Sequence, residues 1–149
     1  MVELENIHDK ALEFSPIHRI VTETDEEALL DELQKTCCAP NGYPVQWYTK
    51  ERQGVLYLNP KKSRLAVAIL QNFLDEYLKN HRGQMDYIHG EEALKNLAEK
   101  ENAVGFLLPA MEKRELFPYV TESGTLPRKT FSMGNATEKR YYLEARQIR

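Results

Sequence analysis

The sequence predicts an α+β fold, in which a single domain over residues 1–149 has a mixed sheet with about four helices packed on it. The main observation is that short β-prone runs alternate with segments of helical periodicity along the chain. A second observation is the succession of a strand at 84–90, a helix at 91–100 and an apolar run at 103–108. This β-α-β outline predicts at least some parallel strand pairing. A length of 149 residues, 42% of them apolar, suffices for one domain with a substantial core.

The chain is organised around a strand expected at 17–21. Pro16 precedes it, and in a sheet proline is confined to edges, bulges or the first position of a strand. Because strand side chains alternate between faces, His18 shares a face with the apolar Ile20, whereas Arg19 points to the other face. His18 is therefore either a core-edge histidine with satisfied nitrogens or a functional group.

Local signals place the other elements. Thr24 followed by Glu27 is a capping box, which predicts a helix ending near residue 36. Residues 39–42 are expected to form a loop. After it, two β-prone runs on either side of the polar loop 50–53 predict a hairpin. A helix over 65–78 is apolar around more than half of its circumference, so we expect it against a sheet or at a subunit contact. The remaining expected elements are a strand at 2–7, a helix at 109–117 and closing strands at 128–131 and 140–145.

Composition and charge argue against several function classes. The formal net charge is −3, and it is uneven: residues 1–36 hold three basic and ten acidic side chains, residues 111–149 eight basic and five acidic ones. The mildly basic C-terminal part lacks a comb of stacking aromatic residues, so we do not expect nucleic-acid binding. Nothing resembles a signal peptide or a membrane span, so we expect a cytoplasmic protein without a membrane partner. The adjacent Cys37 and Cys38 read as reduced thiols, and we expect no metal site.

No diagnostic catalytic motif is present, because the chain lacks a P-loop, a dinucleotide-binding fingerprint, a zinc-protease motif and a nucleophile elbow. Candidates are therefore chosen by residue type. The candidate catalytic residues are His18, Arg19, Asp9 and His89, and the candidate anion-binding residues are Arg128, Lys129 and Thr130. A histidine suits a general base near neutral pH, with Arg19 and Lys129 holding an anion. The sequence identifies no cofactor, and spacing does not tell whether these residues meet.

Five separated segments carry a family resemblance. They are 6–9, 11–21, 86–90, 105–110 and 126–134. Together they resemble the C-terminal part of the bacterial domain-of-unknown-function family 1015, in the form seen in clostridia and related Firmicutes. Pro127, Lys129 and Thr130 loosely fit that family's Pro-x-Lys-Ser-Thr-x-Phe motif, whereas residues 132–134 depart from its Pro-Lys ending.

The resemblance implies that this chain is the excised C-terminal domain of a longer protein. The preceding portion of family members carries a Gly-His-His-Arg segment that resembles one in ParB-like proteins, a group that includes nucleases, sulfiredoxin and free-serine kinases. One expected function is thus the substrate-contacting or supporting half of a phosphate- or nucleotide-handling enzyme. Its partners would be the N-terminal half of the same polypeptide and a phosphate-bearing small molecule. The alternative is a non-catalytic interaction domain that forms a homodimer through the 65–78 helix and an edge strand. Whether the domain has enzymatic activity of its own stays open.

Overall fold

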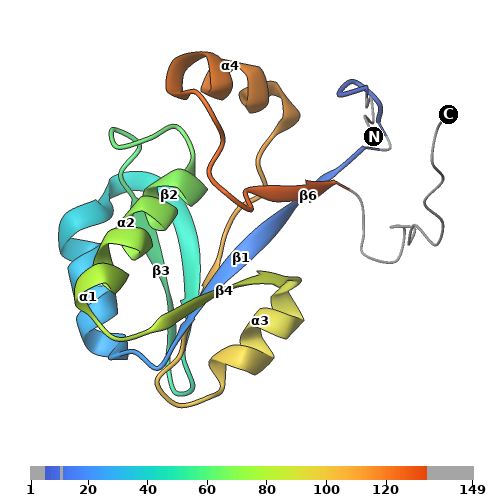
Figure 1. The fold of residues 1–149 in the computed structure, drawn as a ribbon. Coiled ribbons are helices and arrows are strands. Elements are labelled where there is room, and N and C mark those ends of the chain that lie inside the picture. The colour runs from blue at the N-terminus through green and yellow to red at the C-terminus, as the bar shows by residue number, and fades with distance from the viewer. Residues whose placement is uncertain (1–5, 11, 134–149) are drawn as a thin grey trace, which may run out of the picture.

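Strand β1 (Phe14–Thr22) is the centre of the sheet in the computed structural model, which describes residues 6–10 and 12–133 (Figure 1). It pairs antiparallel with β4 through residues 17–22, with β5 through 19–21 and with β6 through 14–16. The elements that follow β1 are α1 (Glu26–Cys37), β2 (Cys38–Tyr48), β3 (Gln53–Leu58), α2 (Ala66–Asn80), β4 (Gln84–His89), α3 (Glu91–Ala98), β5 (Val104–Leu107), α4 (Lys113–Ser123) and β6 (Phe131–Met133). The strand predicted to start at Ile17 begins three residues earlier, so Pro16 lies inside it, opposite Phe131 of β6.

The predicted α+β class is confirmed, but the predicted parallel pairing is wrong. The sheet runs β3-β2-β5-β1-β4 with β6 beside β1, and every pairing among the described residues is antiparallel. β4 and β5 are parallel to each other, as the β-α-β outline requires, but β1 lies between them and pairs with both. The local sequence of a crossover sets the direction of its two strands and leaves open which third strand separates them.

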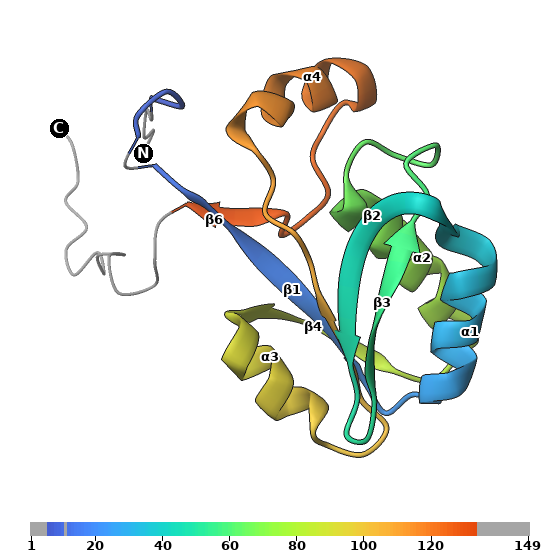
Figure 2. The same ribbon diagram turned by 180° about the vertical axis from the view of Figure 1, so that it is seen from behind.

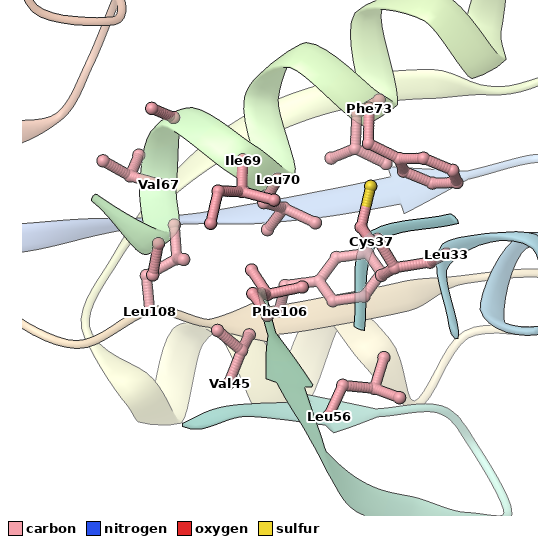
Figure 3. Packing of buried hydrophobic residues seen from close by; sticks show 14 of the residues in the cluster. Leu33, Cys37, Val45, Leu56, Val67, Ile69, Leu70, Phe73, Phe106 and Leu108 are labelled. Carbon is pink, nitrogen blue, oxygen red and sulfur yellow. The ribbon is translucent and has the colours of Figure 1, made fainter. Parts of the chain in front are cut away.

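Helices cover both faces of the sheet. α1 and α2 pack on one face and α3 on the other (Figures 1 and 2). Val21, Val104 and Phe106 are buried toward α1 and α2, in the cluster that Figure 3 shows. Ile20 is buried toward α3. The predicted alternation of β1 side chains between the two faces of the sheet is therefore confirmed, and both faces are buried.

The close fit of α3 to the sheet depends on Gly105 of β5. A Cβ atom at this position would lie 3.1 Å from Cγ of Leu94 and 3.3 Å from Cβ of Ala98, both in α3. A larger residue would push the helix away from the strand, because a packed interface of this kind has no space to absorb it.

The helix starts differ from two sequence predictions. The N-cap of α1 is Asp25 and not Thr24, since the Asp25 carboxylate accepts a hydrogen bond from the Ala28 amide at 3.0 Å. The helix predicted from Pro109 starts instead at Lys113, where Glu112 forms a capping box with Glu115. Side-chain caps for exposed amides decide both starting points.

The buried helix α2 is as apolar as predicted, and the chain itself covers it. Nine of its residues are buried, and it packs against α1 and the sheet. Of the two places that the sequence left open for this helix, the structure shows the one against the sheet. Its apolar face is therefore not available for a dimer contact.

Strand β2 includes residues 39–42, which were predicted as a loop. The ladder with β3 shifts register there, so that Cys38 and Tyr43 both lie opposite Leu58. The backbone of Gly42 approaches Leu58 so closely that a Cβ atom would lie 2.3 Å from the Leu58 carbonyl oxygen. Such a bulge lets the chain bend around the end of β3.

Two predicted strands fall largely outside the described residues. Residues 2–5 of the strand at 2–7 are not described, and Ile7 lies in a turn. The strand at 140–145 is not described either, and of the one at 128–131 only Phe131 lies in a strand, β6. None of the helices in the described part of the chain is long and apolar enough to cross a membrane.

Candidate functional site

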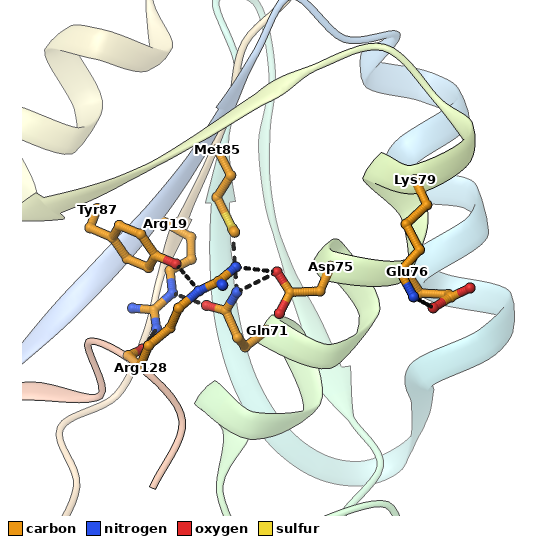
Figure 4. A network of polar contacts seen from close by, with 8 residues as sticks. All are labelled: Arg19, Gln71, Asp75, Glu76, Lys79, Met85, Tyr87 and Arg128. Atoms are coloured by element: carbon orange, nitrogen blue, oxygen red, sulfur yellow. Dashed lines mark hydrogen bonds and ion pairs between the residues drawn. The ribbon is translucent and has the colours of Figure 1, made fainter.

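Arg19 is fully buried, and its guanidinium bonds to the protein itself (Figure 4). Nε donates to Oε1 of Gln71 at 3.0 Å. Nη1 donates to the carbonyl oxygens of Ile17 at 2.6 Å and Lys129 at 2.9 Å, and Nη2 donates to that of Arg128 at 2.9 Å. All but one of the N–H donors of this side chain thus have partners, and three of these partners are backbone carbonyls. Arg19 fixes the turn that precedes β6 to the centre of the sheet.

Aromatic packing completes the surroundings of Arg19. Its guanidinium lies 4.8 Å from the centroid of the Tyr87 ring, across the β1–β4 ladder. Burial lowers the pKa of Arg19 to about 10, and Tyr87 and Asp75 partly offset this shift. The group therefore stays cationic at neutral pH. A buried cation whose donors already have partners is a structural clamp.

Arg128 lies outside this clamp with an exposed side chain. Its Nε donates to the hydroxyl of Tyr87 and its Nη2 pairs with Oδ1 of Asp75, both at 2.5 Å. Asp75 also accepts a hydrogen bond from Nε2 of Gln71 at 2.9 Å. The carboxylate of Asp75 offsets much of the positive charge that Arg128 could offer to a ligand.

The side chains of the other two anion-binding candidates differ in exposure: that of Lys129 is exposed and that of Thr130 is buried. Lys129 has a positive φ of 54° and an exposed side chain, while its carbonyl is held by Arg19. Thr130 is buried, and its hydroxyl donates to the Pro127 carbonyl at 2.6 Å. Of the three candidates, Lys129 has an exposed side chain that forms no ion pair with the described residues.

His18 is 4% exposed and holds the chain after β5. Its Nδ1 accepts a hydrogen bond from the Leu108 amide at 3.2 Å, so the neutral ring carries its proton on Nε2. Burial lowers the pKa of His18 from its ordinary value; Glu91 opposes this shift, whereas Arg19 and His89 add to it. The ring is therefore neutral at pH 7, but the lone pair that a general base would use is bonded to the backbone.

The remaining catalytic candidates lie at the margins. His89 is exposed at the end of β4, opposite Ile17, and is near enough to His18 for their charges to interact. Asp9 lies before β1, and its carbonyl accepts a hydrogen bond from Nζ of Lys113. The structure thus places His18, Arg19 and His89 on two adjacent strands, but the side chains of His18 and Arg19 lie on opposite faces of the sheet.

Four of the five segments that carry the family resemblance meet at β1, which lies largely within segment 11–21. Segment 86–90 pairs with β1 through β4, and segment 105–110 does so through β5 and the Leu108–His18 bond. Segment 126–134 is joined by β6 and by Arg19. Sequence reasoning missed Gln71, Asp75 and Tyr87, which complete this polar cluster. Gln71 could have been found as a polar residue within the apolar pattern of its helix.

A second surface feature is the outer side of β3, the last strand in the sheet order. Val55 and Tyr57 are 46% and 50% exposed. α3 contacts β1, β4 and β5 and does not extend over β3 (Figure 2). The strand contains neither a charged residue nor a proline, the features that commonly protect sheet edges from pairing.

In the comparisons with known proteins, no protein-family model, no curated protein and no solved structure matches this chain. The family resemblance therefore stays a prediction, and function has to be argued from the arrangement of the residues.

Proposed function

We propose that this chain is the substrate-contacting or supporting half of a phosphate- or nucleotide-handling enzyme, with the turn at 127–130 as the anion contact. The observation that carries the proposal is the clamp of Arg19 on the two carbonyls of that turn, which leaves Lys129 directed outward. The meeting of four of the five resemblance segments at β1 supports it.

The clamp gives the turn the rigidity that an anion site needs. Because the carbonyls of Arg128 and Lys129 are bonded to a buried cation, the turn is held in one position before a ligand arrives. A held turn loses less conformational freedom on binding than a mobile loop does. The ammonium of Lys129 then serves as a point charge for a phosphate, with the exposed Arg128 beside it.

The described residues of this chain are suited to holding a substrate in position and not to reacting with it. The Nδ1 lone pair of His18 is bonded to the Leu108 amide, and Arg19 is bonded to carbonyls. We therefore expect the reacting groups to come from the N-terminal half of the same polypeptide, and the isolated chain to bind an anion without turning it over.

Calorimetric titration with inorganic phosphate and with ATP tests this proposal, on this chain and on any longer natural protein that contains it. We expect Lys129→Ala to weaken binding by about tenfold, the effect of losing one charge-assisted contact. Lys35→Ala is the matched control, because Lys35 is an exposed lysine on α1. The proposal fails if neither protein binds either anion, or if the two variants bind equally.

The exposed outer side of β3 favours a second function, a non-catalytic interaction domain that forms a homodimer. Two copies can pair their β3 strands antiparallel about a twofold axis, which continues the ladder and brings together Val55 and Tyr57 of both copies. Sedimentation equilibrium would show a dimer that Val55→Lys dissociates and that Gln84→Lys, on the opposite edge strand, leaves intact. A chain that stays monomeric at every concentration would rule this function out.

A further inference from the structure

After β5 the chain leaves the sheet, forms α4 and returns to pair β6 with β1 (Figures 1 and 2). We call residues 108–130, which make this excursion, the α4 strap. The two ends of the strap are bonded to two consecutive residues of β1, His18 and Arg19, whose side chains lie on opposite faces of the sheet. The strap can therefore be released at one end while the other end stays attached.

The two attachments use different chemistry. At the start of the strap, Nδ1 of His18 accepts a hydrogen bond from the Leu108 amide at 3.2 Å. At its end, the guanidinium of Arg19 donates to the carbonyl oxygens of Arg128 and Lys129, both at 2.9 Å. The first attachment needs a neutral ring, because a protonated histidine carries a hydrogen on both nitrogens and cannot accept. The second needs a cation.

Between its two ends the strap is weakly held. It places Leu108, Met111 and Tyr119 in the main apolar cluster, whereas α2 alone has nine buried residues. Pro118 lies inside α4 and has no N–H to donate to the carbonyl of Arg114. Segments with few buried apolar contacts open at a lower free energy than the core does.

Surface contacts add little to this hold. Nζ of Lys113 donates to the carbonyl of Asp9, and Arg64 pairs with Glu122 at 2.7 Å. The two side chains of this ion pair are 61% and 50% exposed, and exposed ion pairs contribute little to stability. The bond at the start of the strap is thus a main restraint on the chain that leads into α4.

The groups around the His18 ring decide how easily it takes up a proton. Burial is the largest effect and lowers its pKa, Arg19 and His89 add to this shift, and Glu91 at the start of α3 opposes it. Glu91 itself pairs with Lys95 at 2.6 Å. β5, the other strand beside β1, has the sequence Val-Gly-Phe-Leu and carries no charge. Release of the strap opens the ring to water, so the open form takes up a proton at a higher pH than the closed form.

The attachment at Arg19 does not respond to pH in the same range. Burial lowers the pKa of Arg19 to about 10, and Tyr87 partly offsets this shift, so the guanidinium stays cationic at and below neutral pH. Its bonds to the two carbonyls at the end of the strap therefore persist. The two attachments of the strap thus differ in their response to protons.

We propose that the α4 strap is a pH-sensitive switch: protonation of His18 releases its start from the sheet, while Arg19 keeps its end attached. The moving part consists of residues 108–127, and the sheet and α2 stay folded when it opens. Opening withdraws Met111 and Tyr119 from the main apolar cluster and so uncovers apolar surface of that cluster. This switch is independent of the proposed anion contact, because the turn that makes that contact stays bonded to Arg19.

Amide hydrogen exchange of the folded chain at about pH 7.5 and about pH 5 tests the proposal, with each rate compared with that of an unprotected amide at the same pH. Amides of α2 report on unfolding of the whole domain. We expect the Leu108 amide and those of α4 to be less protected than those of α2 at both pH values. Their protection should fall by up to about tenfold for each pH unit below 6.5, because the open form takes up one proton.

The variant His18→Asn removes the titrating group and keeps a side-chain oxygen that can accept from the Leu108 amide. In this variant the protection of α4 should change by less than about twofold between the two pH values. His8→Asn is the matched control, because His8 is exposed and is not among the groups that act on His18. The control should keep the pH dependence of the natural chain.

Three results would overturn the proposal. Equal protection of α4 and α2 would mean that the strap opens only when the whole domain unfolds. Protection of α4 that is the same at both pH values would mean that opening takes up no proton. An unchanged pH dependence in His18→Asn would mean that another group takes it up. The first two comparisons use the natural chain, so they hold even if the variant does not fold.

Discussion

Buried polar groups in the middle of β1 and just beyond its C-terminal end differ in their hydrogen bonding. In the middle of the strand, Arg19 has four hydrogen bonds and His18 accepts one from the backbone. Just beyond the C-terminal end, Thr24 is as buried as His18, and its hydroxyl has no partner within hydrogen-bonding geometry in the described structure. The difference is one of stability, because a buried polar group with partners holds the fold together, whereas a group without partners does not offset the cost of its burial.

The largest effect should come from removing the satisfied cation. Arg19→Met leaves three backbone carbonyls and Gln71 without their donor, so we expect a loss of about 3–5 kcal/mol in the free energy of unfolding. Urea denaturation measures it. Arg19→Lys should recover only part of the loss, because an ammonium cannot reach four acceptors spread around a planar guanidinium.

Arg128→Met is the control for the clamp. Its ion pair with Asp75 involves side chains that are 60% and 40% exposed, so the loss should stay below about 1 kcal/mol. If Arg128→Met were as destabilising as Arg19→Met, the turn would owe its position to the surface ion pair.

The next effect is a dependence of stability on pH. The pKa of His18 in the folded chain lies below its ordinary value of 6.5, so the unfolded chain binds the proton first as the pH falls. The contribution of neutral His18 is complete above pH 6.5 and is lost as the pH falls through the lowered folded pKa. Each unit between the two pKa values corresponds to about 1.4 kcal/mol.

The variant His18→Asn tests this dependence, because its side-chain carbonyl can still accept from the Leu108 amide but cannot titrate. Unfolding free energies measured between about pH 7.5 and about pH 5, on either side of the ordinary pKa of histidine, should fall less steeply for this variant. Equal slopes for the variant and the natural chain would mean that His18 is not the group responsible.

The smallest effect should have the opposite sign. Thr24→Val replaces an unpartnered hydroxyl with a methyl group, so the free energy of unfolding should stay the same or rise by about 1 kcal/mol. Thr130→Val should lower it by about 1 kcal/mol, because the Thr130 hydroxyl donates to the Pro127 carbonyl. Thermal unfolding of the two variants measures both. A loss in Thr24→Val as large as that in Thr130→Val would remove the contrast between Thr24 and the buried polar groups that have partners.

Periodicity predicted the elements that bury an apolar face. The alternation of Ile20 and Val21 between two layers, the buried helix α2 and the β2–β3 hairpin all follow from local sequence. The start of α4 could have been found from the Glu112–Glu115 capping box. The bulge at Gly42 could not, because its cause is the approach of Leu58 from another strand.

Sequence analysis predicted some members of the candidate site, and it did not predict their roles. His18, Arg19 and Lys129 were chosen as groups that could act on an anion, and the structure gives the first two hydrogen bonds to the backbone. The partners of Arg19 lie up to 110 residues away along the chain. No spacing rule connects such positions.

The sequence by itself determined the α+β class, the direction of β4 and β5 and the alternation of β1 side chains between two faces, because each depends on patterns within a few residues. Only the tertiary structure decided that β1 lies between β4 and β5, that Arg19 clamps a distant turn, and that the Thr24 hydroxyl is buried without a partner in hydrogen-bonding geometry. The physical reason is that hydrogen-bond satisfaction depends on which segments meet in space. A polar residue is recognisable in the sequence, but its partner, or the lack of one, is a property of the fold.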